Sequence, residues 1–348
     1  MIKPRALRRG DRIAAISLSA GWPNVFPKAY CDGKRQMEEA FGVQVMESRH
    51  ALASPDWLAA HPEARAEDLM EVLRDESIRG IVSTIGGEES IRILPFLDLS
   101  VIRENPKIFI GYSDTTVTHF AFLKAGVTSF YGPSLMAGFD ENGGLLSYMA
   151  DSVRQVLFGS SISEAPIAPN QDAWTCGSFA WGDRKRNEKP RPFQRCSGWR
   201  WLQGEGRHRG HLVGGCLEVV DWLRGTPVWP DQSIWRDSIV FLETSEDAPS
   251  VTAVVRMLRA LAATGALRET RGILFGRPYG EEAMFEEYDG AILQVLAELG
   301  LGSLPLVTRM DFGHTDPKFI VPYGVDAEVN CDAQQIRLLE SATAHSFE

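Results

Sequence analysis

The sequence predicts an α/β protein in which parallel strands alternate with helices. Three observations support this prediction. Short, nearly continuous apolar runs recur along the chain, as is typical of parallel strands buried on both faces. Helical patterns separate most of these runs, and the last segments resemble paired antiparallel strands. We therefore expect an N-terminal parallel-sheet domain and a C-terminal α/β domain that ends in closing β-strands.

The composition is that of an ordinary globular protein. The 348 residues suffice for two domains, and 44% of them are hydrophobic. A formal net charge of −10 argues against a nucleic-acid polymer as a partner. No run approaches the roughly 20 apolar residues that cross a membrane, so we expect no membrane partner. The five cysteines form no Cys-x-x-Cys pair, which indicates neither a zinc site nor a disulfide framework and fits a cytoplasmic protein.

The first part of the chain predicts four strands, each followed by a turn or a helix. The helix over 64–75 is regular, because Leu69, Val72 and Leu73 lie on one face. The predicted strands cover residues 12–19, 43–46 and 80–85 and a run that begins at Pro106. The predicted helices cover residues 28–41 and 64–75, a short segment that ends near Pro95, and a helix from Val117 with Asp114 or Thr115 as its N-cap.

The character of the sequence changes between residues 159 and 209. Prolines and tryptophans accumulate there, and the charged stretch 182–195 has no period. We expect a connector and a long loop, and long loops in compact proteins are usually functional. Its tryptophans either stack on a flat substrate group or fasten the loop to the body.

The remainder of the chain predicts a second α/β unit. The predicted strands cover residues 210–216, 238–244, 272–276 and 305–309, and the tail strands cover 327–330 and 335–339. The predicted helices end at Leu223 or cover residues 252–263 and 291–299. The expected organisation is therefore an N-terminal domain over 1–158, a linker and substrate loop over 159–209, and a C-terminal domain over 210–348.

Ser113 lies on a predicted strand-to-helix turn, two residues after Gly111. Such a turn holds a hydroxyl above the carboxyl edge of the sheet and aims backbone N–H groups at the same point. These are the requirements of a nucleophile with an oxyanion site. Thr115 replaces the second glycine of the Gly-x-Ser-x-Gly pattern. The alternative is that Ser113 only caps the helix.

Gly86 and Gly87 follow another predicted strand at the same edge of the sheet. Ligands of parallel sheets bind beyond the carboxyl ends of the strands, and glycines let the backbone approach them closely. Glu88 and Glu89 would repel a phosphate, which disfavours a phosphate cradle. A plain turn is the alternative.

A serine nucleophile needs a base and an acid that orients the base. His314 directly follows a predicted strand, beside Gly313, and is the strongest candidate base. Glu243 closes an apolar strand, where a carboxylate is seldom plain core. The other candidate histidines are weaker, namely His119, His208 and His211.

These residues lie in motifs that resemble the serine peptidase family of LD-carboxypeptidases and microcin C self-immunity proteins. The motifs occur in family order along nearly the whole chain: Arg9–Ile13, Gly86-Gly87, Gly111–Asp114, Tyr131–Pro133, Gly214-Gly215, Leu242–Thr244, Gly313–Pro317 and Pro322–Gly324. The resemblance implies Ser113 as nucleophile, Glu243 as acid and His314 as base. It also implies an oxyanion hole from the backbone N–H groups of Gly87 and Asp114, a homodimer, and no metal or cofactor.

The tryptophan-containing insertion resembles the immunity branch of this family. In that branch an aromatic residue of the loop stacks on a nucleobase, which makes Trp174 and Trp181 the candidates here. Cys216 stands where the immunity branch commonly has an asparagine after the glycine pair. With Gly86 and Glu88, these three residues form the expected substrate-binding set.

The sequence thus leads to one main expectation and two alternatives. The main expectation is a serine hydrolase that cuts an amide bond near a free carboxylate and detoxifies peptidyl- or aminoacyl-nucleotides. The first alternative is an LD-carboxypeptidase that trims murein tetrapeptides. The second belongs to another class, a non-catalytic module that binds an anion or a nucleotide.

Overall fold

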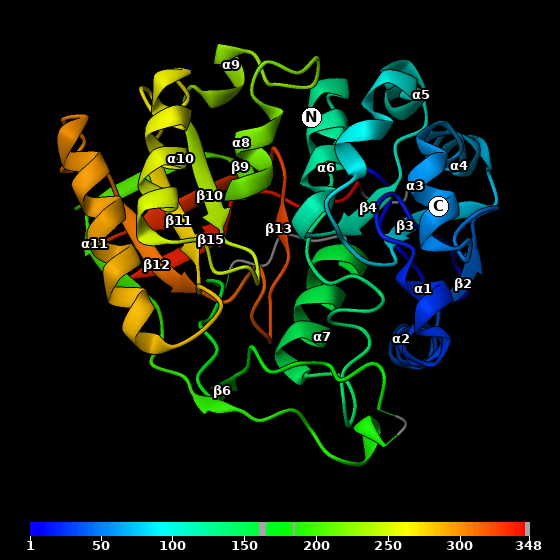
Figure 1. The fold of residues 1–348 in the computed structure, drawn as a ribbon. Coiled ribbons are helices and arrows are strands. Elements are labelled where there is room, and N and C mark those ends of the chain that lie inside the picture. Colours follow the sequence, from blue (N-terminus) through cyan, green and yellow to red (C-terminus); the bar gives the residue numbers. More distant parts are fainter. Residues whose placement is uncertain (160–164, 184, 345–348) are drawn as a thin grey trace.

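Two mixed sheets lie side by side in the computed structural model, which describes residues 1–159, 165–183 and 185–344 (Figure 1). The first sheet has six strands, in the order β13 (Val321–Pro322), β5 (Phe130–Tyr131), β4 (Ile108–Gly111), β3 (Ile78–Ser83), β1 (Arg12–Ile16) and β2 (Gln44–Glu47). β1 to β5 run parallel, and β13 is antiparallel to β5. The predicted N-terminal parallel sheet is therefore confirmed.

Helices cover this sheet and connect its strands. They are α1 (Trp22–Val25), α2 (Pro27–Phe41), α3 (Pro55–Ala60), α4 (Pro62–Arg74), α5 (Leu99–Glu104), α6 (Thr116–Ala125) and α7 (Ser147–Val153). The 3₁₀ segments Ser90–Phe96 and Ser113–Thr115 and the π-helical turn Arg154–Phe158 complete this part. α2 starts with a proline, and Gly42, with φ +69°, caps its C-terminus; both are common at the ends of helices.

The second sheet has seven strands, and four of them run parallel. Its order is β15 (Gln335–Leu338), β14 (Asp326–Asn330), β9 (Arg207–Cys216), β10 (Ser238–Glu243), β11 (Gly272–Gly276), β12 (Leu306–Met310) and β8 (Arg200–Gln203). Its helices are α8 (Leu217–Leu223), α9 (Gln232–Trp235), α10 (Val251–Ala263) and α11 (Glu282–Glu298). β14 and β15 are antiparallel, which confirms the predicted closing strands.

Several elements differ from the sequence prediction. The segment expected as connector and loop contributes β8, the first residues of β9, and the small pair β6 (Ala173–Trp174) and β7 (Gln194–Arg195). α11 begins at Glu282, well before the expected 291. β8 forms because β12 offers it a free edge, and such a partner is a property of the sheet that no local pattern encodes.

The chain from Val321 to Gly324 ties the two sheets together. β13 pairs with β5, so Val321 lies opposite Tyr131 in the first sheet. The N–H of Tyr323 then donates to the carbonyl of Ser129 at 2.8 Å, and the N–H of Gly324 donates to the carbonyl of Leu212 in β9 at 2.7 Å. Figure 1 shows β13 between the two halves. The sheets are thereby held in one fixed relation.

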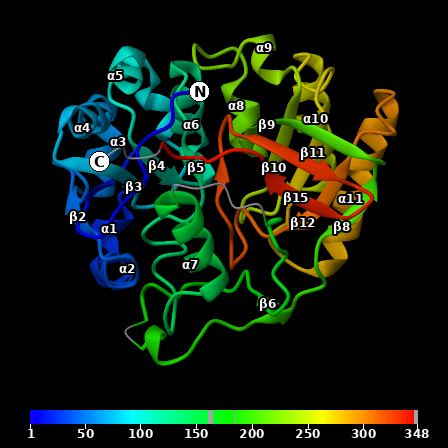
Figure 2. The same ribbon diagram turned by 180° about the vertical axis from the view of Figure 1, so that it is seen from behind.

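Helix α6 also lies at the junction of the two halves, beside α5 and α8 (Figure 1). All of its residues except Lys124 are buried. The C-terminal chain returns to the first half as well, as Figure 2 shows from behind. There the N–H of Ala344 donates to the carbonyl of Pro4 at 2.8 Å.

Asp311 fastens the insertion to the second sheet. Its carboxylate accepts hydrogen bonds from Trp199 Nε1 at 2.7 Å and from the N–H of Asn170 at 2.9 Å. It also accepts one from Arg277 Nη2 at 2.8 Å, and both side chains of this ion pair are almost completely buried. A buried guanidinium needs such a partner, because an uncompensated charge is costly inside a protein.

Asp311→Asn removes the negative charge beside Arg277 and keeps the shape of the side chain. We expect the free energy of unfolding to fall by about 3–5 kcal/mol, since the guanidinium would stay buried without a counter-ion. Urea unfolding measures this change. The control is Asp237→Asn, which breaks an exposed pair with Arg271 and should cost at most about 1 kcal/mol. Equal losses in the two variants would contradict this role of Asp311.

Candidate active site

Ser113 has a backbone conformation that is unusual for a serine. Its φ is +63°, in the left-handed region, and it lies between β4 and α6 at the start of one 3₁₀ turn. Such a conformation costs about 1–3 kcal/mol and is found where a nucleophile is held on a strained strand-to-helix turn. The N-cap position of α6 belongs to Thr115, whose hydroxyl donates to the carbonyl of Tyr112 at 2.8 Å. Helix capping therefore does not explain Ser113.

Gly86 and Gly87 pass directly beside this turn. A Cβ atom on Gly86 would lie 3.0 Å from the Cβ of Ser113, so a side chain there would crowd the serine. Gly87 has φ +143°, and its Cβ would lie 2.5 Å from the Oγ of Ser19. Among the described residues, the N–H groups of Gly87 and Asp114 have no hydrogen-bond acceptor. Both donors are therefore free for a ligand oxygen.

His314 and Glu243 form a buried pair on the second sheet. Glu243 is the last residue of β10, and its Oε2 lies 2.7 Å from Nδ1 of His314. A Cβ on Gly313 would lie 2.5 Å from the same carboxylate oxygen, and the φ of Gly313 is +95°. Only glycine at 313 leaves room for this carboxylate. The structure thus brings together the predicted base and the predicted acid.

Tyr131 connects this pair to the serine turn. Its hydroxyl donates to Glu243 Oε1 at 2.5 Å and accepts a hydrogen bond from the N–H of Ser113 at 3.1 Å. The side chain of Tyr131 is fully buried, and burial together with the nearby Glu243 charge raises the pKa of its hydroxyl well above the usual value. The tyrosine stays neutral and bridges the acid of one sheet to the backbone of the other.

A second carboxylate contacts the other ring nitrogen of His314. Glu246 Oε2 lies 3.0 Å from Nε2. Burial by itself would lower the pKa of His314, but the charge of Glu243 and hydrogen bonds to both carboxylates raise that pKa to about 10. The hydrogen bond from His314 in turn lowers the pKa of Glu246 to about 2. The two carboxylates thus favour the protonated form of the ring, in which both nitrogens donate.

One cavity of about 850 Å³ contains most of the predicted site residues. Ser113, Gly86 and Glu88 line it from the first half, and His314 and Cys216 line it from the second. The cavity therefore lies where the carboxyl ends of both sets of parallel strands face each other, as expected for α/β sheets.

The two candidate tryptophans differ in position. Trp181 lines the cavity and packs in an aromatic group with Trp22, Phe26 and Phe179, at centroid distances of 5.7–5.9 Å. Trp174 is fully buried and does not line it. Its ring packs against Phe285, and the guanidinium of Arg277 lies 5.2 Å from its centroid. The structure therefore does not bring Trp174 to the substrate side; it fastens the insertion, the alternative that the sequence left open.

Cys216 presents a buried, neutral thiol to the cavity. Burial and the charge of Glu243 raise its pKa well above the usual value. Its N–H donates to Thr116 Oγ1 at 3.2 Å, and its Sγ lies 3.5 Å from Glu218 Oε2. A thiol in this state is a weak donor and offers no charge to a substrate.

Sequence reasoning missed four residues of the cavity region: Tyr131, Glu246, Trp22 and Trp222. Tyr131 was noted only inside a motif, and nothing local to it predicts a contact with Glu243, 112 residues away. The one available indication of Glu246 was its place in the acidic segment Glu243–Asp247, three residues after the predicted acid.

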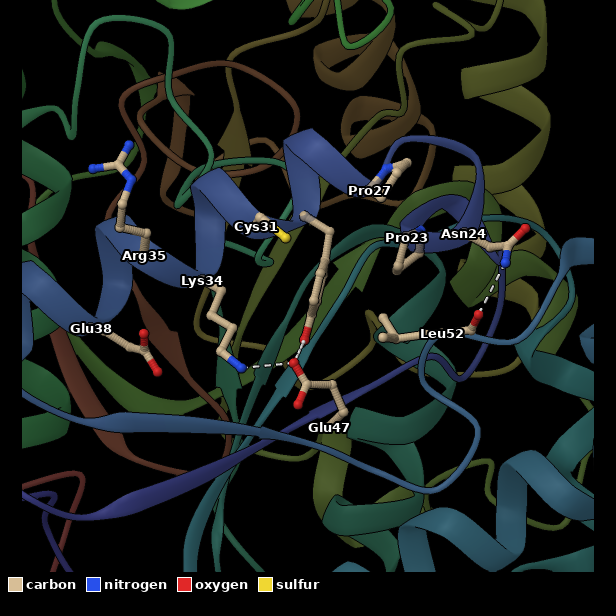
Figure 3. Close-up of a pocket in the computed structure, with 10 residues that line it drawn as sticks. Pro23, Asn24, Pro27, Cys31, Lys34, Arg35, Glu38, Glu47 and Leu52 are labelled. Atoms are coloured by element: carbon tan, nitrogen blue, oxygen red, sulfur yellow. Dashed lines mark hydrogen bonds and ion pairs between the residues drawn. The ribbon is translucent and has the colours of Figure 1, made fainter.

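A separate hollow of about 490 Å³ lies along α2 and contains none of the predicted site residues (Figure 3). Its polar groups pair with one another, because Lys34 Nζ and the Tyr30 hydroxyl both donate to Glu47 Oε1. In the ranges that the structure describes, no cluster of His, Cys, Asp and Glu could hold a metal ion.

Comparison with known proteins supports the family resemblance. Family models described as the LD-carboxypeptidase N-terminal and C-terminal domains match residues 13–132 and 209–329. An MccF-like protein from Streptococcus pneumoniae, solved in complex with AMP, is 31% identical with a TM-score of 0.85, over 94% of this chain and 98% of that one. The microcin C7 self-immunity protein MccF of Escherichia coli is 28% identical over 79% of this chain and 78% of its own. A probable murein peptide carboxypeptidase of Bacillus subtilis is 27% identical over 98% and 95%.

The free energy of unfolding should fall as the pH rises through the range in which His314 is protonated in the folded protein but not in the unfolded chain. The pKa of His314 is raised from 6.5 to about 10, so this stabilisation is complete below pH 6.5 and is lost as the pH approaches 10. In that window we expect the free energy of unfolding to fall by about 1.4 kcal/mol per pH unit more in the wild type than in His314→Gln. Urea unfolding at several pH values in this window measures both slopes. Equal slopes in the wild type and in His314→Gln would contradict the raised pKa of His314.

Proposed function

Because the chain belongs to the LD-carboxypeptidase family of peptidases, we propose that it is a serine hydrolase with Ser113, His314 and Glu243 as its triad. The observation that carries the proposal is the shared cavity: the strained Ser113 turn and the Glu243–His314 pair line it from opposite halves of the fold. The strained turn suits a nucleophile, and the buried carboxylate orients the ring of the base through Nδ1.

The geometry supports a sequence of proton transfers between these residues. Ser113 Oγ attacks the carbonyl carbon while Nε2 of His314 takes its proton. Glu243 holds Nδ1 and stabilises the imidazolium. The free N–H groups of Gly87 and Asp114 donate hydrogen bonds to the developing oxyanion, and one such donor is typically worth about 2.7–4 kcal/mol. His314 then protonates the leaving group, and water releases the acyl group by the reverse steps.

The substrate that we propose is a peptidyl- or aminoacyl-nucleotide, cut at the amide bond beside the nucleotide part. Trp181 lines the cavity as part of its aromatic group, and a base can stack on such a ring. The similarity to an MccF-like protein that was solved with AMP agrees with this choice.

A murein tetrapeptide is the alternative substrate, and the similarity to the Bacillus subtilis protein favours it. In that case the scissile amide bond lies next to the free carboxylate of a terminal D-alanine. Incubation with each substrate type, followed by mass detection of the products, separates the two. The binding-module alternative predicts tight binding without turnover and no labelling by a fluorophosphonate.

Two expectations about the setting of the protein stay predictions, the cytoplasmic location and the homodimer. Over the described ranges, no helix has both the length and the apolar character that crossing a membrane demands.

Ser113→Ala should abolish hydrolysis and leave the fold intact. We expect turnover to fall at least about 10⁴-fold, as is typical when a triad nucleophile is removed. Product formation measures turnover, and circular dichroism and thermal melting check the fold. Ser178→Ala is the matched control, because Ser178 lines the same cavity and has no part in the proposed chemistry. If Ser113→Ala hydrolysed every accepted substrate at the wild-type rate, the nucleophile assignment would be wrong.

Trp181→Ala should weaken the binding of nucleotide substrates and leave the binding of murein peptides unchanged. Loss of one stacking ring typically costs about 1–3 kcal/mol, so we expect KM for an aminoacyl-nucleotide to rise about tenfold or more. Trp181→Phe keeps an aromatic face and should retain most of the affinity. KM for a murein tetrapeptide serves as the reference, and an equal loss with both substrates would mean that Trp181 acts on the cavity as a whole.

A further inference from the structure

Both ring nitrogens of His314 are occupied in the free protein. Glu243 engages Nδ1 at 2.7 Å, and Glu246 engages Nε2 at 3.0 Å. In the proposed mechanism, Nε2 is the atom that must accept the proton of Ser113. With a carboxylate on each side, both nitrogens donate, and a ring with two N–H groups has no lone pair for that proton. The pair with Glu246 is therefore incompatible with the first step of hydrolysis.

Glu246 is free to leave this position by side-chain rotation. Its side chain is 62% exposed, whereas the side chain of Glu243 is fully buried. The backbone beside it is fixed, since Glu218 Oε1 accepts hydrogen bonds from the N–H and the hydroxyl of Ser245 at 2.9 and 2.7 Å. The structure thus holds one permanent partner of His314 and one exchangeable partner.

We propose that Glu246 gates the site: it holds His314 in the free protein and transfers its carboxylate to a positively charged group of the substrate. This inference rests on the proposed function and adds a substrate class to it. The class comprises peptidyl or aminoacyl compounds that carry an ammonium group within reach of the scissile bond.

The cavity itself explains why the cation must come from the substrate. Arg191 is the one arginine or lysine among the described residues that line the cavity. Its guanidinium already pairs with Glu141 and Asp316 and donates to the carbonyl of Gly177. Glu218 and Asp247 also line the cavity, from the same half of the fold as Glu246. A carboxylate that turns away from His314 therefore meets other acids, and the described lining offers it no unpaired cation, so a cationic partner must come with the substrate.

Charged and titratable groups surround His314 from several elements. Close to the ring or its two carboxylates are Glu243 at the end of β10 and Glu246 after it, Tyr112 after β4 with its ring centroid 4.9 Å from that of His314, Tyr131 on Glu243, Cys216 and Glu218 at the end of β9 and the start of α8, Asp316 and Lys318 in the loop of His314, and Arg191 of the insertion. Asp316 is already paired with both Lys318 and Arg191. Glu246 is therefore the exposed charge whose movement changes the protonation of the ring most.

The protons balance in each state. When Glu246 pairs with a substrate ammonium, His314 releases its Nε2 proton to water and keeps the Nδ1 proton on Glu243. The neutral ring then accepts the proton of Ser113 as Oγ forms its bond to the substrate. After the acyl group is released, Glu246 returns to Nε2, and the ring takes up one proton from solvent.

Two fluorophosphonates test the gate without any natural substrate, one neutral and one with an ammonium group on its chain. With either probe, Ser113 Oγ bonds to phosphorus, fluoride leaves, and His314 takes the serine proton. At pH 7 we expect the wild type to react at least about tenfold faster with the ammonium probe, since only that probe displaces Glu246. In Glu246→Gln the neutral probe should react at least about tenfold faster than in the wild type, and the preference should vanish. The pH midpoint of labelling should also move down.

Asp56→Asn is the matched control, because it removes one negative charge from the cavity lining without touching His314. It should keep the wild-type preference. The gate is overturned if the neutral probe labels Ser113 no faster in Glu246→Gln than in the wild type. It is also overturned if Glu246→Gln keeps the preference for the ammonium probe. Absence of labelling at Ser113 in every variant and at every pH would instead overturn the proposed hydrolase and the gate with it.

Discussion

The buried carboxylate of Glu243 is the group on which the site depends. It accepts from His314 on one oxygen and from Tyr131 on the other, so each oxygen has a hydrogen-bond donor. A buried carboxylate needs such partners, because it has no water to bind. The cost is steric, because Gly276 and Gly313 must lack side chains for the side chain of Glu243 to fit: the first lies against its Cβ and the second against its carboxylate. The fold around β10 is built to hold one charge in one orientation.

The same carboxylate connects the parts of the site that come from the two sheets. Through Tyr131 it reaches the backbone N–H of Ser113, which belongs to the first sheet. The chain from Val321 to Gly324 hydrogen-bonds to both sheets and fixes their relation. The insertion adds a third tie, since Arg191 of this segment pairs with Glu141 of the first half and Asp316 of the second. A site assembled from both halves needs such rigidity, because small displacements between reacting groups are costly.

The cavity combines this rigid part with an adaptable one. Glu243, Tyr131 and Cys216 are buried, whereas Glu246 and Trp22 are exposed. Buried, satisfied groups keep the machinery in place, and exposed side chains can change partners at little cost. This combination of fixed and exchangeable side chains agrees with the relatives of the chain, whose names refer to different substrates although they belong to one family.

The sequence by itself determined the α/β class, the parallel strands and the strand-end positions of Ser113, Glu243 and His314. It did so because buried parallel strands leave apolar runs, and residues that end such runs lie at one edge of a sheet. Only the tertiary structure decided that Tyr131 bridges the two sheets, that Glu246 contacts His314, and that Trp174 is buried while Trp181 is not. These outcomes follow from the docking of segments that lie far apart in the chain, or from which face of a loop meets the core. Local spacing carries no information about either, since burial and pairing depend on the partner that the folded chain supplies.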